Sequence, residues 1–143
     1  MSDSELAPSL IAAFRATHYQ VFTAQDSAFT MRIDQRCEAL AQLHRKSGVA
    51  CSAYLTAWNP YSAETPIELN HAQQKKLYDE MDAAGHQSMR GFGFDPENTS
   101  LGEQHLLVLG ISRIDAIECG RRYQQNAIVW SGENAVPELI LLR

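Results

Sequence analysis

The sequence predicts an α+β fold with a ferredoxin-like β-α-β-β-α-β core, an antiparallel sheet and an extra C-terminal strand. The 143 residues are 45% hydrophobic and 20% charged, which is typical of a globular protein. From residue 49 onward, strand and helix patterns follow one another in this order, separated by helix-start motifs and glycines. A chain of this length buries roughly 68–70% of its unfolded surface, so we expect one domain, 1–143, whose core needs no metal or disulfide.

Residues 1–48 predict a helix-hairpin-helix extension in front of the core. Apolar residues fall on one face of a helix expected over 4–16. The segments YQVFT (19–23) and FTMRI (29–33) flank a polar loop, as the strands of a hairpin do. A second helix is expected over 34–46, because apolar residues recur there at helical spacing, and Gly48 ends it.

The core, 49–143, begins with a strand and a helix that has three agreeing start signals. VACSAYLTAW (49–58) is rich in small, aromatic and β-branched residues and predicts a strand. In the segment TPIE, Thr65 can cap the helix, Pro66 suits the first helical position and Glu68 completes a capping box. We expect this helix to run to about residue 84, with Leu77, Met81 and Ala84 facing inward, before Gly85 stops it.

The rest of the core contains four strands, a loop and a helix that begins with a second capping motif, Ser112-x-x-Asp115. In order, we expect a strand over 87–94, the loop FDPENTSLG, a strand over 104–111, a helix to about 124, and strands over 127–130 and 138–142. Right-handed crossovers then give the core strand order fourth, first, third, second, with two helices on one face. The N-terminal helices can cover the other face, and the hairpin or the last strand can extend an edge. The alternative is an open mixed α/β sheet of different order.

Charge and composition exclude several classes of protein. The net charge of −5 argues against binding to a nucleic acid backbone, which favours a basic surface. The N-terminal segment has no basic region followed by a long apolar run, and no window approaches ~20 apolar residues, so we expect neither secretion nor a membrane span. Three scattered cysteines, Cys37, Cys51 and Cys119, are typical of reduced thiols in a cytoplasmic protein.

Polar residues scattered over 70 positions are expected to meet at one end of the core sheet. The first core strand ends there and its antiparallel neighbours begin there, beside the N-terminus of the first core helix. Because that terminus carries free N–H groups and a partial positive charge, a polar or anionic small ligand can be held there. The predicted ligand-binding residues are Thr56, Asn59, Ser62, Asn70, Arg90, Glu103, Gln125 and Asn126.

The same residues also have a structural explanation, which stays open at this point. Asn59-Pro60 is an ordinary turn starter, and asparagine side chains bond to their own backbone in turns. Arg90 and Glu103 can form a salt bridge across the hairpin they flank. Asn126 can satisfy backbone groups at a strand end.

No motif indicates catalysis, a metal or a cofactor. The five histidines lack metal-ligand spacing, and no serine or cysteine lies in a nucleophile elbow. Gly91-x-Gly93 joins strand to strand, so it is no dinucleotide fingerprint and indicates a twist or a close backbone approach. Trp58 and Trp130 close strands, where they can cover a pocket but more simply pack the sheet against a helix.

Three functions remain compatible with these observations. The first is binding of a polar or anionic small ligand at the sheet end. The second is a protein-interaction or homodimer module, because the final strand ELILL can pair with another strand at the sheet edge. The third is an enzyme that uses Glu103 as acid or base, for which one acidic residue near Arg90 is the only support.

Several motifs together resemble one protein family. TAWNPYS, Asn70, GFGFDP, Glu103 and QNAIVW are similar to the signature of an uncharacterised bacterial family classed as a domain of unknown function, with T-A-x-N-P-x-S and Q-N-A-I-x-W as its clearest parts. The resemblance covers the chain from about Tyr19 to Leu142. This family often has an aromatic residue just before the acidic one, whereas Ser100-Leu101-Gly102 stands there in this chain. The resemblance implies a small bacterial protein and brings no established activity.

Overall fold

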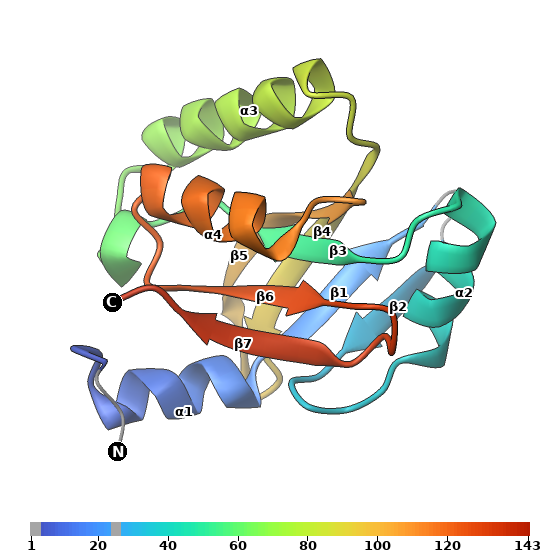
Figure 1. Cartoon of the computed structure of the whole chain (residues 1–143). Coiled ribbons are helices and arrows are strands. Elements are labelled where there is room, and N and C mark those ends of the chain that lie inside the picture. Colours follow the sequence, from blue (N-terminus) through green and yellow to red (C-terminus); the bar gives the residue numbers. More distant parts are fainter. Residues whose placement is uncertain (1–3, 24–26) are drawn as a thin grey trace.

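Seven strands form one curled antiparallel sheet in the order β2-β1-β4-β5-β3-β6-β7 (Figure 1). The computed structural model describes residues 4–23 and 27–143, with the side chains of 99–101 left out. The strands are β1 (His18–Phe22), β2 (Ala28–Met31), β3 (Ser52–Leu55), β4 (Ser88–Asp95), β5 (Asn98–Leu109), β6 (Ala127–Ser131) and β7 (Pro137–Leu141). The helices are α1 (Pro8–Ala16), α2 (Glu38–Ser47), α3 (Ile67–Ala83) and α4 (Arg113–Arg122), with a short 3₁₀ turn at Pro60–Ser62.

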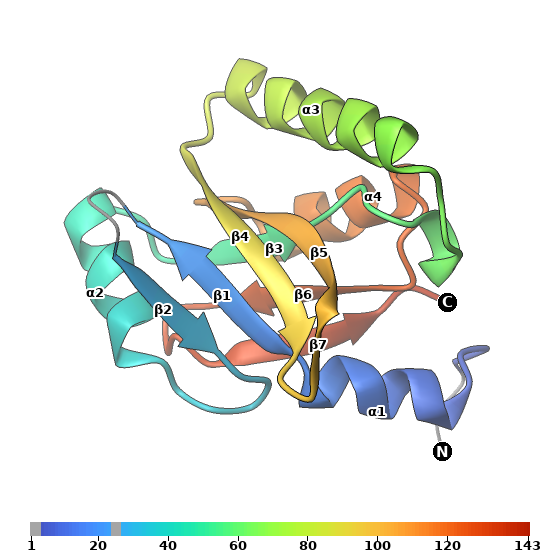
Figure 2. The same ribbon diagram turned by 180° about the vertical axis from the view of Figure 1, so that it is seen from behind.

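The fold class is confirmed as α+β with an antiparallel sheet, whereas the whole strand order departs from a ferredoxin-like sheet. The inner strands follow the expected order β6-β3-β5-β4. The N-terminal hairpin adds β1 and β2 beside β4, and β7 extends the other side beside β6 (Figure 2). The sheet therefore has seven strands where a ferredoxin-like sheet has four.

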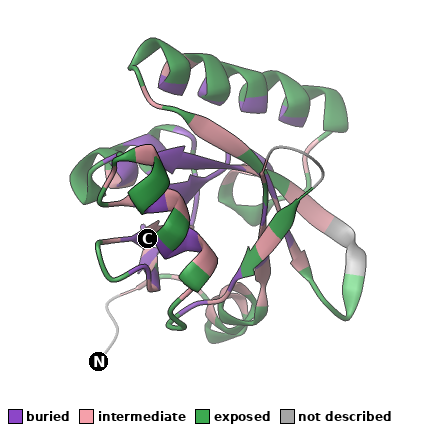
Figure 3. Ribbon diagram, turned by 90° about the vertical axis from the view of Figure 1, so that its right-hand side faces the viewer, coloured by how far each residue is buried: buried purple, intermediate pink, exposed green. Residues whose placement is uncertain are grey.

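Two hydrophobic cores lie on opposite faces of the sheet. Alternate residues of β5 divide between them, since Leu106 and Val108 pack under α3 and α4, and Leu107 and Leu109 pack with α2 and the hairpin. Leu77 and Met81 are the buried apolar residues of α3, and each contributes about 1.5–3 kcal/mol by its burial. Figure 3 shows α3 buried only on the side that faces the sheet.

The N-terminal helices are shorter than expected. Helix α1 begins at Pro8, where a missing N–H costs nothing, and residues 1–3 lie outside the described part. Helix α2 begins at Glu38, because the backbone N–H groups of Asp34 and Cys37 donate to the carbonyls of Pro137 and Ala135 in the β7 region. Gly48 ends α2 as predicted, with a φ of 69°.

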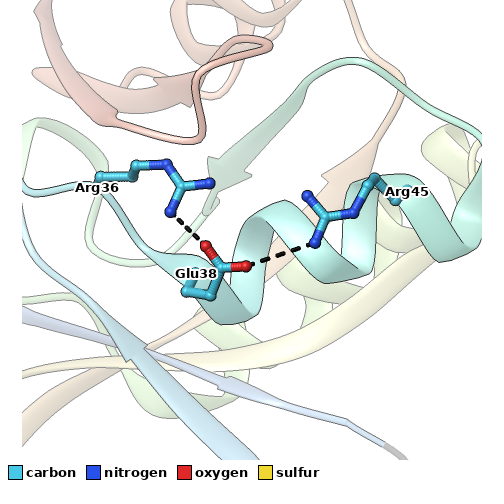
Figure 4. Close-up of polar contacts among 3 residues, drawn as sticks. All are labelled: Arg36, Glu38 and Arg45. Atoms are coloured by element: carbon cyan, nitrogen blue, oxygen red, sulfur yellow. Dashed lines mark hydrogen bonds and ion pairs between the residues drawn. The ribbon is translucent and has the colours of Figure 1, made fainter.

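Glu38 in the first turn of α2 binds two arginines (Figure 4). It accepts a hydrogen bond from Arg36 and another, at 3.4 Å, from Arg45. The Arg36 guanidinium lowers the pKa of this carboxyl. All three side chains are exposed, so water and salt screen these ion pairs, and we treat them as surface charge.

The predicted Thr65 cap of α3 is wrong. Pro66 occupies the N-cap position, and the Thr65 hydroxyl donates to the Ala63 carbonyl at 3.0 Å. Gly85 stops the helix as expected, with a φ of 87°, although Ala84 is exposed and not inward-facing. In α4 the predicted cap is confirmed, because the Ser112 hydroxyl accepts from the Asp115 N–H at 3.1 Å.

The segment expected as the loop FDPENTSLG is mostly strand. Strand β4 continues to Asp95, whose carboxylate accepts the Glu97 N–H at 2.9 Å in a tight turn, and β5 starts at Asn98. Strand β3, in contrast, covers only part of the expected 49–58, although residues 52–58 are all buried. Strand β4 has the expected length, and Arg90 is its third residue, five positions before its end at Asp95.

Candidate functional site

A polar network around Asn59 joins β3, α3 and β5 at one end of the sheet. The Asn59 N–H donates to Asn70 Oδ1 at 2.8 Å, and Asn59 Oδ1 accepts from Asn70 Nδ2 at 2.9 Å and from the Thr65 N–H at 3.1 Å. Asn59 Nδ2 donates to Glu103 Oε2 at 3.1 Å. We call these four residues, Asn59, Thr65, Asn70 and Glu103, the Asn59 network.

The other residues predicted at this end of the sheet are also bound to protein neighbours. The Thr56 hydroxyl donates to the Gln104 carbonyl at 2.5 Å. Gln125 Nε2 donates to the Trp58 carbonyl at 3.2 Å. Asn126 Nδ2 donates to the Ser62 hydroxyl at 2.9 Å. All predicted site residues except Arg90 therefore gather near the exit of β3, where their hydrogen bonds hold the turn and the strand ends together.

The turn that follows β3 has an unusual backbone. Asn59, Tyr61 and Ser62 all have positive φ, at 46°, 54° and 60°. Asparagine tolerates this region better than most residues, because its short polar side chain can bond locally. The Tyr61 N–H donates to the Gln124 carbonyl at 2.6 Å, and Arg143 lies 4.3 Å from the Tyr61 ring centroid.

Arg90 lies apart from this network. It pairs with Leu106 in the β4–β5 ladder, and both side chains therefore lie on the α3 face of the sheet. Glu103 pairs with Gly93 and extends to the opposite face. The predicted salt bridge between Arg90 and Glu103 is absent from the ion pairs of the described residues, because strand parity separates the two side chains.

A cleft of about 800 Å³ is lined by residues of α3 and of the strands β1, β4 and β5. Its α3 wall is a stripe at i, i+3, i+4 and i+7, beside the buried stripe that contains Leu77. The lining residues are Phe22, His71, Gln74, Lys75, Tyr78, Ser88, Arg90, Gly91, Phe92, Gln104, His105 and Leu106.

The polar lining of this cleft is cationic. Arg90 is exposed and forms no ion pair or side-chain hydrogen bond with any described residue. The Lys75 ammonium pairs with Asp79 at 2.6 Å on the same helix. Among the described residues that line the cleft, none is an Asp or a Glu. The free guanidinium of Arg90 is thus available to an anion, which it can bind through two parallel hydrogen bonds.

Aromatic side chains supply the apolar surface of the cleft. Phe22 and Tyr78 are 40% and 47% exposed, which is high for residues of their size. Phe92 lies on the floor, where its ring stacks with that of Phe94 at a centroid distance of 6.0 Å. Such rings can cover the face of a planar ligand.

The stripe His71, Gln74, Lys75 and Tyr78 was not predicted as part of a site. In the sequence, Lys75 stands beside Lys76 in a polar stretch, which is typical of a solvated helix surface. A signal existed in the helical spacing of these four residues next to an apolar stripe. This signal points to a cleft only when α3 is known to stand over an uncovered part of the sheet.

A small cavity of about 30 Å³ lies on the other face of the sheet. Burial raises the pKa of the Glu103 carboxyl, and the hydrogen bond from Asn59 acts in the opposite direction. Burial lowers the pKa of His105 to about 4. His105 stacks on Tyr54 at a centroid distance of 4.6 Å, and burial also raises the pKa of both Tyr19 and Tyr54.

The Gly91-x-Gly93 motif makes room for this cluster. A Cβ at Gly91 would lie 2.4 Å from the Tyr54 hydroxyl, and one at Gly93 would lie 3.1 Å from the His105 ring. A Cβ at Gly91 would also lie 2.7 Å from the Gln20 carbonyl oxygen, so the close backbone approach is found at Gly91, whereas the atoms nearest Gly93 belong to side chains.

Three further observations concern metal ligands, helices and cysteines in the part of the chain that the structure describes. Within residues 4–23 and 27–143, no group of three His, Cys, Asp or Glu side chains could hold a metal ion. Among the helices of these residues, none is long and apolar enough to span a membrane. Cys119 is buried, whereas Cys37 and Cys51 are partly exposed, and all three are free thiols.

Comparison with known proteins identifies one family. A sequence model described as protein of unknown function (DUF3293) matches residues 55–128, slightly more than half of the chain. The matched segment runs from the end of β3 to the start of β6 and includes the Asn59 network, α3, Arg90 and α4. The chain has no significant match among curated proteins or among solved structures.

Proposed function

Since the chain belongs to the DUF3293 family, whose function is unknown, we infer its function from the site and propose that the cleft under α3 binds a small planar anion. The observation that carries this proposal is the free Arg90 guanidinium in a cleft of about 800 Å³, in which no described lining residue is a carboxylate. Small-molecule sites are typically clefts of about 300–1,000 Å³ with apolar walls and a few polar groups.

The lining supports both parts of such a ligand. Arg90 would bind a carboxylate or phosphate group, and Lys75 and His71 on the opposite wall would add donors. Phe22, Tyr78 and Phe92 would contact the planar, apolar part. This proposal keeps the predicted class of ligand, a polar or anionic small molecule, and keeps Arg90 as a ligand-binding residue. The proposed position of the site moves from the sheet end to the cleft.

Binding of matched anionic and neutral compounds tests the proposal. We expect aromatic carboxylates or nucleoside monophosphates to raise the melting temperature, and the corresponding amides or nucleosides to have little effect. At 100 times its dissociation constant, a ligand adds about 2.7 kcal/mol to the stability of the folded state. Comparison of the aromatic carboxylates with the nucleoside monophosphates shows which anionic group the site binds.

Arg90→Gln is the decisive variant and Arg121→Gln its control. Arg121 is an exposed arginine of α4 that does not line the cleft. We expect Arg90→Gln to weaken anion binding at least tenfold in isothermal titration, and Arg121→Gln to leave it unchanged. Equal effects of the two variants, or no binding across the panel, would overturn the proposal.

An interaction through the sheet edge is the alternative function, and β7 gives it limited support. In the described residues β7 pairs with β6 alone, so its outer edge can accept another strand. However, the Pro137 carbonyl already accepts the Asp34 N–H, and the charged Glu138 lies on the same strand, so the free edge is short. Light scattering tests this alternative, which predicts a dimer at micromolar concentration.

Catalysis by Glu103 is the weakest of the three functions. Its carboxyl has a raised pKa, as a catalytic acid often does. The adjoining cavity of about 30 Å³ has room for roughly one water molecule and not for a substrate. We therefore propose a binding protein. We also propose a cytoplasmic location, which its scattered free thiols support, and a bacterial origin, which only the resemblance of its motifs supports.

A further inference from the structure

Gln74 carries a buried polar atom without a partner at the wall of the cleft. Its side chain is only 7% exposed, and Nε2 forms no hydrogen bond with any described residue. Within the cleft lining that the structure describes, it is the only buried side-chain nitrogen or oxygen in this condition. Buried polar atoms in folded proteins are nearly always satisfied, so this atom calls for an explanation.

The orientation of the Gln74 amide is fixed by β3. Its Oε1 accepts the Ala57 N–H at 2.9 Å and lies 3.3 Å from the Thr56 hydroxyl. Turning the amide over would bring two donors, Nε2 and the Ala57 N–H, against each other. Gln74 is therefore held as a hydrogen-bond donor on its Nε2 side, and it cannot exchange this role for that of an acceptor.

We propose that Gln74 determines specificity in the cleft by donating from Nε2 to an acceptor on the ligand. This inference rests on the proposed function and narrows the ligand class to planar anions that also carry a ring nitrogen or a carbonyl oxygen. Arg90 binds the anionic group from the floor, and Gln74 binds the acceptor from the α3 wall.

Access to Nε2 requires movement of neighbouring side chains. Solvent does not reach the atom in the ligand-free arrangement. The adjoining lining residues Lys75, Tyr78 and Gln104 are exposed, and exposed side chains change rotamer on a ps–ns timescale. A ligand that enters between them can bring an acceptor to Nε2 without unfolding α3.

Isosteric ligand pairs measure this contact directly. Quinoline carboxylates and naphthoates share their shape and charge, but only the quinolines have a ring-nitrogen acceptor. We expect the wild-type chain to bind at least one quinoline carboxylate about tenfold more tightly than the matching naphthoate, measured by isothermal titration. Equal affinities for every positional pair would overturn the proposed role of Gln74.

Variants at position 74 assign the preference to the amide. Gln74→Glu keeps an acceptor for the Ala57 N–H but presents an oxygen where Nε2 was, so the tenfold preference should be lost or reversed. Gln73→Glu, on the exposed side of the same helix, is the control for added charge and should keep it. If Gln74→Glu does not fold, Gln74→Met removes the donor without adding charge.

The two proposals fail in different ways. If no anion of the panel, with naphthoates, quinoline carboxylates and nucleoside monophosphates included, binds the wild-type chain, the proposed function falls and the role of Gln74 with it. If both bind, Arg90→Gln abolishes binding and Gln74→Glu or Gln74→Met leaves the preference unchanged, the proposed function stands and the role of Gln74 is refuted.

Discussion

Replacing Asn59 with alanine tests whether the polar residues at the exit of β3 hold the fold. The side chain forms three hydrogen bonds, with the Thr65 N–H, with Asn70 Nδ2 and with Glu103 Oε2. A hydrogen bond between neutral groups contributes about 1 kcal/mol to stability, and one to a charged group about 1.5–3 kcal/mol. Alanine at a φ of 46° also loses local stabilisation, since the left-handed region costs L-residues about 1–2 kcal/mol.

We therefore expect Asn59→Ala to lower the free energy of unfolding by about 4 kcal/mol, a large part of the 5–15 kcal/mol typical of a domain. Urea unfolding at pH 7, followed by the fluorescence of Trp58 and Trp130, measures this change. Asn134→Ala is the matched control, because Asn134 is exposed and its side chain accepts only the Val136 N–H, at 3.1 Å. It should cost about 1 kcal/mol.

The effect of Asn59→Ala should also depend on pH. The hydrogen bond from Asn59 favours the charged form of Glu103, against the burial that raises its pKa. This hydrogen bond therefore stabilises the folded state when Glu103 is ionised, and its contribution is lost as the pH falls through the native pKa of that carboxyl. The destabilisation should be smaller at pH 4 than at pH 7. If Asn59→Ala lowers the free energy of unfolding at pH 7 no more than Asn134→Ala does, the structural role of the Asn59 network is refuted. Its residues would then again be candidates for contacting a ligand.

Three further predictions concern the opposite face and the buried thiol. Gly91→Ala should lower the free energy of unfolding by about 1–3 kcal/mol through overpacking, because its Cβ would lie 2.4 Å from the Tyr54 hydroxyl. Gly132→Ala, whose Cβ would have its nearest atom at 3.2 Å, is the control and should lower it less in the same urea unfolding. Cys119 should react with a thiol reagent at pH 8 only after unfolding, because it is buried and burial raises its pKa to about 11; reaction of all three thiols in the native chain would contradict this. Burial holds the native pKa of His105 at about 4, whereas its pKa in the unfolded chain is about 6.5. Between these two pH values the unfolded state binds more protons than the folded state. The free energy of unfolding should therefore fall by up to about 3 kcal/mol as the pH drops from 6.5 to 4. His105→Phe should flatten this part of the stability profile, and an unchanged slope would show that other groups cause it.

Local sequence signals were sufficient for the inner fold and insufficient at the ends of elements. The alternation and glycine stops predicted the core strands and both core helices, and the Ser112 cap was confirmed. The Thr65 cap failed because the Thr65 N–H binds Asn59, a residue of the preceding turn. The start of α2 failed because the Asp34 N–H binds the β7 region, more than 100 residues later in the sequence. Propensity yields to such tertiary contacts, which a single sequence does not display.

At the candidate site too, the sequence predicted some features and missed those that depend on tertiary structure. Antiparallel pairing was enough to predict that Asn59, Glu103 and their neighbours meet, because it fixes which strand ends share an edge. Arg90 was misplaced although the expected strand, 87–94, differs from β4 by one residue at each end, because the end of a strand does not show which face of the sheet a side chain occupies. The β4–β5 register is needed to know that Arg90 and Glu103 extend to opposite faces of the sheet, since a shift in register by one residue exchanges the faces.

The structural and binding interpretations of the polar residues converge on α3. Asn59 and Thr56 tie the N-terminal half of this helix to β3 through Asn70 and Gln74, and Leu77 anchors the following turn in the core. The other side of α3 faces β4 across the cleft, which stays open. These hydrogen bonds therefore fix the height and orientation of the cleft wall without contacting a ligand. It follows that loosening the Asn59 network should weaken the proposed binding in the cleft indirectly, by moving Gln74 relative to Arg90, while the lining residues themselves remain intact.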